Sequence, residues 1–262
     1  MSIRTVHPAG ELAMESHGAG VPVVFLHGLT FDRRTWRPII DRLGSGVRSI
    51  AIDLPGHGDS PGAGERLDQL AELIANYLEC ACGITDPIIV GHSMSGALAL
   101  VYASTHTVRG VVTVDQSWNV RPFAEAVRQS AAALRGDGFS AAFGPFEQTI
   151  GIERLAPAIR ADVIARRRVH RDLVLGYWDE LFDVDPSELQ RRIEGQAASV
   201  KVPCLAVFGR ELSAAERGHM ADLVPAVQIT EWDGDGHMAH LMQPARFAAR
   251  LRAFIDDCGR EF

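Results

Sequence analysis

Long hydrophobic runs are missing from this chain of 262 residues. A membrane-spanning helix needs about 20 consecutive apolar residues, and no apolar run of the chain approaches that length. The N-terminal sequence MSIRTVHPAGELAMESHG also lacks the apolar segment of a secretory signal peptide. We therefore expect a soluble cytoplasmic protein that has no membrane partner and keeps its cysteines reduced.

The chain also has few cysteines and no net positive charge. The chain has 4 cysteines, and only Cys80 and Cys82 are close in sequence, so it lacks the second pair that a structural zinc site usually needs. The formal net charge of -7 argues against nucleic acid as the main partner, because phosphate binding needs a basic surface. We read the run Arg166–Arg168 as a solvated helix face, with an anion site as the less favoured alternative.

Apolar runs alternate with helical patterns along much of the chain. The runs are continuous rather than alternating, which is typical of parallel strands covered on both faces. They span residues 21–28, 47–53, 87–92, 108–115 and 202–209, with a shorter piece at 227–230. Helical patterns span residues 35–43, 66–81, 95–104 and 244–258. This order predicts an α/β fold with a mostly parallel sheet flanked by helices.

Residues 116–200 interrupt this rhythm, because they contain no convincing strand. Helical patterns there span residues 121–136, 154–182 and 186–199, separated by glycine and proline. We predict an α/β core made of residues 1–115 and 201–262, with 116–200 inserted as a helical cap, or lid, over a site at the strand ends. The alternative is that these helices only cover the sheet.

Ser93 lies in GHSMSG, between an apolar run and a helical one. A sharp strand-to-helix turn needs small residues on both sides of the residue that it presents, and here Gly91 and Ser95 are small. The usual G-x-S-x-G pattern is therefore relaxed to G-x-S-x-S. This context predicts that Ser93 is a nucleophile held on a strained turn.

A serine nucleophile needs a base and oxyanion-stabilising donors. His237 follows a glycine in a loop before the last helix, so we expect it to be the base; His240, three residues later, is the rival. The segment FLHGLT ends the first predicted strand. We expect the backbone N–H groups of Leu29 and Met94 to form the oxyanion hole, with Gly28 permitting close approach.

Four segments together carry a family resemblance. They are HG at 27–28, DLPGHGDS at 53–60, GHSMSG at 91–96 and GHMAHLMQP at 236–244. In this order and spacing they resemble the α/β-hydrolase fold superfamily, as a serine-nucleophile hydrolase with a helical cap, over essentially the whole chain. The resemblance implies an eight-stranded sheet, a Ser–acid–His catalytic triad in that chain order, and a structural role for His57.

The triad acid has two candidates. In the family it commonly follows the seventh strand as G-x-x-D, but here Gly209-Arg210-Glu211-Leu212 puts leucine at the aspartate position and Glu211 one residue early. In haloalkane dehalogenases and zearalenone-lactonase-like enzymes it follows the sixth strand, where this chain has Asp115. We favour Asp115 and keep Glu211 as the alternative. Many relatives carry a purely structural aspartate at the position of Asp115.

A serine at the nucleophile position implies an acyl-enzyme route and no metal or organic cofactor. We predict cleavage of an ester, lactone or related acyl bond in a small hydrophobic substrate. We expect Trp118, His92 and Phe31 to bind it, with help from cap aromatics. The cap candidates are Phe123, Phe139, Phe143, Phe146 and Trp178.

Other readings of the same residues stay open. They are a carbon–carbon bond hydrolase, a lyase, a cofactor-free haloperoxidase-like activity, an acyltransferase, or a ligand receptor that kept the triad. The sequence leaves the oligomeric state open, and a homo-oligomer is among the states that it allows.

Overall fold

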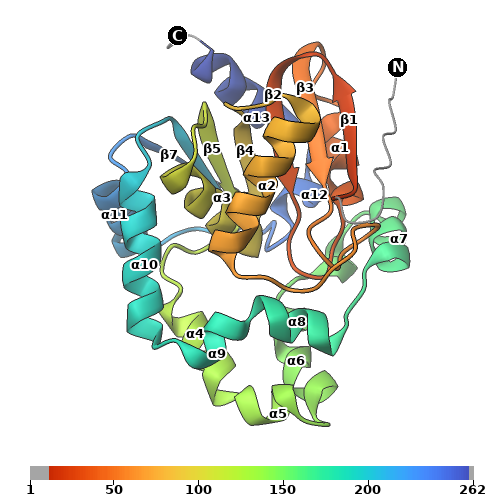
Figure 1. The fold of residues 1–262 in the computed structure, drawn as a ribbon, viewed down its shortest axis with the longest axis vertical. Coiled ribbons are helices and arrows are strands. Elements are labelled where there is room, and N and C mark those ends of the chain that lie inside the picture. Colours follow the sequence, from red (N-terminus) through yellow and green to blue (C-terminus); the bar gives the residue numbers. More distant parts are fainter. Residues whose placement is uncertain (1–11, 260–262) are drawn as a thin grey trace.

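The computed structural model describes residues 12–259, which build one sheet with helices on both faces (Figure 1). Its strands lie in the order β1-β3-β2-β4-β5-β6-β7. All neighbours are parallel except β1 and β3, which are antiparallel. The strands are β1 (Met14–Gly18), β2 (Gly20–Leu26), β3 (Gly46–Ile52), β4 (Ile88–His92), β5 (Gly110–Val114), β6 (Cys204–Phe208) and β7 (Val227–Glu231).

The sheet has seven strands within residues 12–259, not the eight expected. The expectation of eight strands came from the family resemblance, because the sequence has only six apolar runs that predict a strand. All six apolar pieces of the sequence form strands, β2 to β7. The edge strand β1 was not predicted, because its sequence MESHG has no apolar run.

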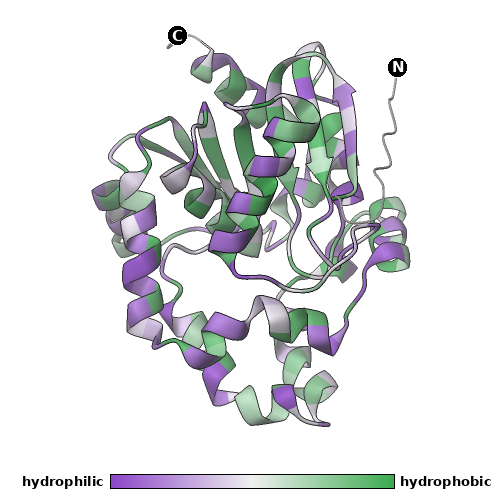
Figure 2. Ribbon diagram, viewed as in Figure 1, coloured by the Kyte–Doolittle hydropathy of each residue, from purple (hydrophilic) through white to green (hydrophobic). Residues whose placement is uncertain are grey.

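Side chains of the sheet alternate between two apolar layers. Val24 and Leu26 of β2 join one cluster of buried residues, and Val23 and Phe25 join the other. Both faces are therefore covered, which explains why the strand sequences are apolar throughout. Figure 2 shows the hydrophobic strands inside and the hydrophilic outer faces of the helices.

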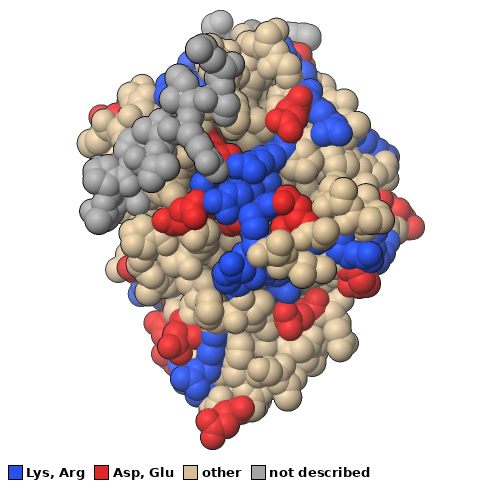
Figure 3. Space-filling model, turned by 90° about the vertical axis from the view of Figure 1, so that its right-hand side faces the viewer, with Lys and Arg blue, Asp and Glu red and all other residues tan. Residues whose placement is uncertain are grey.

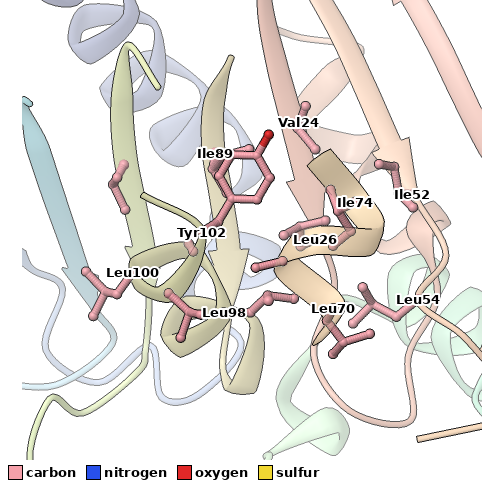
Figure 4. Packing of buried hydrophobic residues seen from close by; sticks show 14 of the residues in the cluster. Val24, Leu26, Ile52, Leu54, Leu70, Ile74, Ile89, Leu98, Leu100 and Tyr102 are labelled. Carbon is pink, nitrogen blue, oxygen red and sulfur yellow. The ribbon is translucent and has the colours of Figure 1, made fainter. Parts of the chain in front are cut away.

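One face of the sheet is covered by α2 (Leu67–Cys82) and α3 (Met94–Thr105). Leu70 and Ile74 of α2 and Leu98 of α3 are fully buried and pack toward the strands (Figure 4). Nearly all of α3 is buried, because α10 (Pro186–Ser199) also packs against it. A helix apolar on all sides is typical of such a buried position.

The other face is covered by α1 (Arg37–Ile40) and α13 (Pro244–Cys258), which contact each other. The short elements η1 (Arg33–Trp36), α11 (Ala214–Leu223) and α12 (Ala239–Met242) complete the part outside the insertion. Within residues 12–259, none of the helices combines the length and the apolar character that crossing a bilayer would require.

The segment between β5 and β6 is helical, as the sequence indicated, and most of its helices lie beyond the carboxyl ends of the strands (Figure 1). The predicted helix over 154–182 is divided, because Arg167 is extended (ψ 135°) and ends α7. The helices are α4 (Arg121–Gln129), α5 (Ala131–Arg135), α6 (Phe139–Gln148), η2 (Ile152–Arg154), α7 (Pro157–Arg166), α8 (Arg171–Tyr177), α9 (Asp179–Asp183) and α10.

Candidate active site

Ser93 sits on a strained turn between β4 and α3. Its backbone has φ 55° and ψ −129°, a region that non-glycine residues rarely adopt. Its N–H donates to the carbonyl oxygen of Val114 at 2.8 Å. A Cβ atom at Gly91 would lie 1.8 Å from the carbonyl oxygen of Ser95, so glycine is required there. The turn therefore holds the Ser93 hydroxyl at the carboxyl edge of the sheet.

Ser95 replaces the usual glycine and gains a specific contact. Its fully buried hydroxyl donates to the carbonyl oxygen of His27 at 2.5 Å. The bond ties the start of α3 to the end of β2, where the predicted oxyanion segment begins. Next to it, a Cβ atom on Gly28 would lie 3.2 Å from the Cβ of Ser93, so Gly28 does permit close approach.

Asp115 follows β5 and bonds directly to His237. Its Oδ2 accepts from Nδ1 of His237 at 2.7 Å, and its Oδ1 accepts from the N–H of Gly209 at 3.1 Å. Burial raises the pKa of Asp115, but the hydrogen bond and charge of His237, together with Gly209, outweigh burial and lower it below its ordinary value. The carboxylate is thus charged near neutral pH and fixes the Nδ1–H tautomer of His237.

Glu211 points away from this arrangement. Its side chain is 77% exposed and pairs with Arg217 at 3.6 Å. Leu212, at the position where relatives carry aspartate, is buried and belongs to the apolar cluster beside α3. Gly209 faces the histidine loop instead, since a Cβ there would lie 1.9 Å from the carbonyl oxygen of Gly236. The end of β6 therefore contributes a backbone donor to the site, and not a carboxylate.

His92 and His240 lie under the loop that carries His237. The Nε2–H of His92 donates to the carbonyl oxygen of His237 at 2.9 Å. The ring of His240 lies 4.4 Å from that of His92 and 4.7 Å from that of Trp36. His240 is fully buried, and burial lowers its pKa to about 3. His240 is thus a neutral ring packed beneath the site.

A cavity of about 630 Å³ opens onto these residues. Ser93, Asp115 and His237 line it, together with Leu29 and Met94. Its far wall is aromatic and comes from the inserted helices: Phe123, Phe143, Phe146, Tyr177 and Trp178. Four of these were expected from the sequence; Tyr177 was not, and Phe139 stacks on Phe143 outside the lining.

The expected substrate-binding residues Trp118, His92 and Phe31 do not line this cavity. Trp118 is 1% exposed and borders a separate hollow of about 350 Å³ beside α10 and α11. Phe31 is buried beneath the guanidinium of Arg167, at 5.3 Å. All three lie next to site residues in sequence, but their side chains point into the protein, and neighbouring positions do not fix that direction.

The cavity rim carries charged groups from both the core and the inserted helices. Glu180 of α9 pairs with Arg66 at 3.2 Å and with Arg192 of α10 at 3.1 Å. Arg66 immediately precedes α2, and all three residues line the cavity. Within the described residues, no three His, Cys, Asp or Glu side chains gather in a way that would hold a metal ion.

The sequence profile of the alpha/beta hydrolase family matches residues 23–250. The chain belongs to this family. Over 249 residues it is 28% identical to 2-succinyl-6-hydroxy-2,4-cyclohexadiene-1-carboxylate synthase of Serratia proteamaculans, covering 90% of this chain and 94% of that protein. This hydrolase-family chain also matches a dihydrolipoyllysine-residue acetyltransferase component of an acetoin cleaving system from Cupriavidus necator at 38% identity. That match spans only 31% of this chain and 22% of the other.

Among solved structures, the fold is similar to that of Est816, described as an N-acyl homoserine lactone degrading enzyme. The TM-score is 0.74 and the identity 25%, over 93% of this chain and 96% of that one. The family and the fold predicted from the sequence are therefore confirmed. The relatives differ in their reactions, so the substrate is not decided by similarity.

Proposed function

We propose that this protein is a serine hydrolase that cleaves an ester or lactone bond of a small hydrophobic substrate. The observation that carries the proposal is the 2.7 Å bond between His237 and Asp115 at the cavity that Ser93 also lines. A base oriented by a partly buried carboxylate beside a serine on a strained turn is the arrangement that acyl transfer needs.

In the proposed reaction, Ser93 attacks the substrate carbonyl while His237 takes the hydroxyl proton. The negative oxygen of the tetrahedral intermediate accepts hydrogen bonds from the N–H groups of Leu29 and Met94. The carbon–oxygen bond to the leaving group then breaks, and the imidazolium of His237 protonates that oxygen. Water deprotonated by His237 hydrolyses the acyl-enzyme, and Asp115 stabilises the imidazolium in both halves.

The aromatic wall supports a hydrophobic substrate. Rings of Phe146 and Trp178 lie 5.1 Å apart at the cavity, and Phe123 packs edge-on against both. Such a surface favours apolar acyl chains or flat rings over small polar groups. A similar fold in an enzyme described as degrading N-acyl homoserine lactones fits this class of substrate.

The first test is labelling by a fluorophosphonate probe with peptide mapping. We expect labelling at Ser93, none in Ser93→Ala, and a rate lowered by about 10⁴-fold in Asp115→Asn, because the amide orients the wrong tautomer of His237. Glu211→Gln is the matched control, since that side chain is exposed and should leave the rate unchanged. Loss of labelling in Glu211→Gln instead would move the acid to β6, and an unlabelled wild type would overturn the proposal.

A lyase is the second candidate, favoured by the likeness to the Serratia proteamaculans synthase over nearly the full length of both proteins. The same base would then remove a proton bound to carbon and no acyl-enzyme would form. Product analysis in ¹⁸O-labelled water separates the two reactions, because hydrolysis places one labelled oxygen in the acid product and elimination places none.

A further inference from the structure

Thr30 has an unusual conformation directly beside a proposed oxyanion donor. It follows Leu29, is 1% exposed, and has φ 72°. A positive φ is costly for a β-branched residue and persists only where surrounding contacts over-determine it. Something must therefore hold the segment of residues 28–31 in place.

Three hydrogen bonds hold Thr30, each from a different direction. Its N–H donates to Nε2 of His57 at 3.1 Å. Its hydroxyl accepts from Nε of Arg167 at 2.8 Å, and its carbonyl oxygen accepts from the N–H of Arg168 at 3.1 Å. The N–H of Thr30 is thus bonded to the core, and its hydroxyl and carbonyl oxygen are bonded to the segment between α7 and α8.

His57 suits the core side of this arrangement. Its Nδ1–H donates to the carbonyl oxygen of Pro55 at 3.1 Å, which leaves Nε2 as an acceptor. Burial lowers the pKa of His57 to about 3, so the ring stays neutral and can accept from Thr30. The turn at residues 53–60 therefore has the structural role expected from the sequence.

The arginine run supplies the other side. Arg167 was expected on a solvated face, yet its side chain is only 12% exposed. Its Nη1 donates to Glu147 of α6 at 2.8 Å, and its guanidinium lies over Phe31 at 5.3 Å. Arg166 pairs with Asp32 at 3.3 Å. These charges are neutralised by protein carboxylates, which speaks against an anion site.

We propose that Arg167 and the backbone of Arg168 clamp Thr30 and thereby position the Leu29 N–H for the developing oxyanion. The proposal rests on the proposed function. It makes Arg167 a positioning residue. Residues 167–170, which link α7 to α8, would then influence the rate of the reaction. The linker lies on the side shown in Figure 3, where arginines gather at the centre with acidic residues around them.

The reason the clamp matters is geometric. An oxyanion donor acts only when it lies about 3 Å from the position of the developing charge, and losing one such donor costs about 10²–10³-fold in kcat. If Thr30 relaxed toward negative φ, the peptide between Leu29 and Thr30 would rotate, and the preceding peptide, which carries the Leu29 N–H, would be displaced with it. The inserted helices therefore influence the reaction through a loop of the core, besides covering the cavity.

The test combines Thr30→Val with Arg167→Met. Valine keeps the shape of threonine but lacks the hydroxyl. Thr30→Ser is the control, because serine retains the hydroxyl. Substrates are 4-nitrophenyl butyrate and its thiono counterpart, because sulfur is a poor hydrogen-bond acceptor and the ester-to-thionoester rate ratio reports on the oxyanion hole. We expect each single variant to lower kcat by about 10-fold or more, with KM changed by less than about threefold.

In the clamp, the two side chains act as a unit, so the double variant should be no slower than the slower single one. The ester-to-thionoester ratio should fall in both single variants and recover in Thr30→Ser. Additive losses, an unchanged kcat, or a lower kcat with an unchanged ratio would each overturn the clamp. A wild type that turns over no ester and is not labelled at Ser93 would instead overturn the proposed function, and the clamp's catalytic role with it.

Discussion

His92 shows how a residue beside the nucleophile serves the base instead. It is 2% exposed, and its Nε2–H donates to the backbone carbonyl oxygen of His237, not into the cavity. Burial, His240 and His237 lower the pKa of His92, so the ring is a neutral donor. The residue is therefore placed to fix the loop that carries His237.

We expect His92→Leu to lower kcat by about tenfold, because the loop of His237 loses an anchor and small displacements of a catalytic group are costly. His92→Gln keeps an N–H donor and should recover most of the rate. His240→Phe is the control, since the ring nitrogens of His240 have no hydrogen-bond partner among residues 12–259. Steady-state kinetics with 4-nitrophenyl esters checks this; equal losses in His92→Gln and His92→Leu would contradict it.

At the residue scale, sequence reasoning works where a motif constrains the backbone. The glycines around Ser93 and before His237 mark turns with few alternatives, so those residues could be identified without coordinates. The direction of a side chain that follows a strand has no such marker, which is why the sequence placed Trp118 and Phe31 at the substrate although they do not line the cavity. Arg167 was missed because its partner Thr30 is 137 positions away in sequence.

At the scale of elements, the strands could be predicted because parallel strands need apolar residues on both faces. The long helix expected over 154–182 could not be divided correctly. Its periodicity continues through Arg167, but contacts with Thr30 favour an extended backbone there. Tertiary hydrogen bonds of this kind override local propensity and leave no periodic signal.

Helix α6 offers a matched pair of aromatic residues for testing the cavity wall. Phe146 lines the cavity, whereas Phe139, on the same helix, stacks on Phe143 at 5.3 Å outside it. We expect Phe146→Ala to lower kcat/KM for an octanoate ester by about tenfold and to change it little for acetate, because only the longer chain reaches the ring. Phe139→Ala should leave the octanoate-to-acetate ratio unchanged. The ratio for each variant is the measurement, and equal effects of both would locate the acyl chain elsewhere.

At the scale of the whole molecule, four buried histidines make the fold sensitive to acid. They are His27, His57, His92 and His240, and burial lowers the pKa of each. The pKa of His57 and that of His240 are about 3, against about 6.5 in an unfolded chain. As pH falls below about 6.5, these histidines therefore bind protons in the unfolded state but not in the folded state.

We expect the free energy of unfolding to fall between about pH 6.5 and pH 5 by roughly 1 kcal/mol per pH unit for each of His57 and His240, with His27 and His92 acting in the same direction. Urea unfolding at several pH values measures the slope. His240→Phe removes one titrating ring and should flatten it by one histidine's share. A slope unchanged in that variant would mean that His240 is protonated in the folded state.

The clamp at Thr30 also bears on how a substrate reaches the cavity. The linker of residues 167–170 is fastened to the core by buried contacts, whereas Glu180 at the rim meets the core through a half-exposed ion pair with Arg66. Exposed pairs of this kind contribute at most about 1 kcal/mol each and weaken with salt. We therefore expect α9 to separate from Arg66 at high ionic strength, which should make substrate entry faster, while the linker and the oxyanion loop keep their positions.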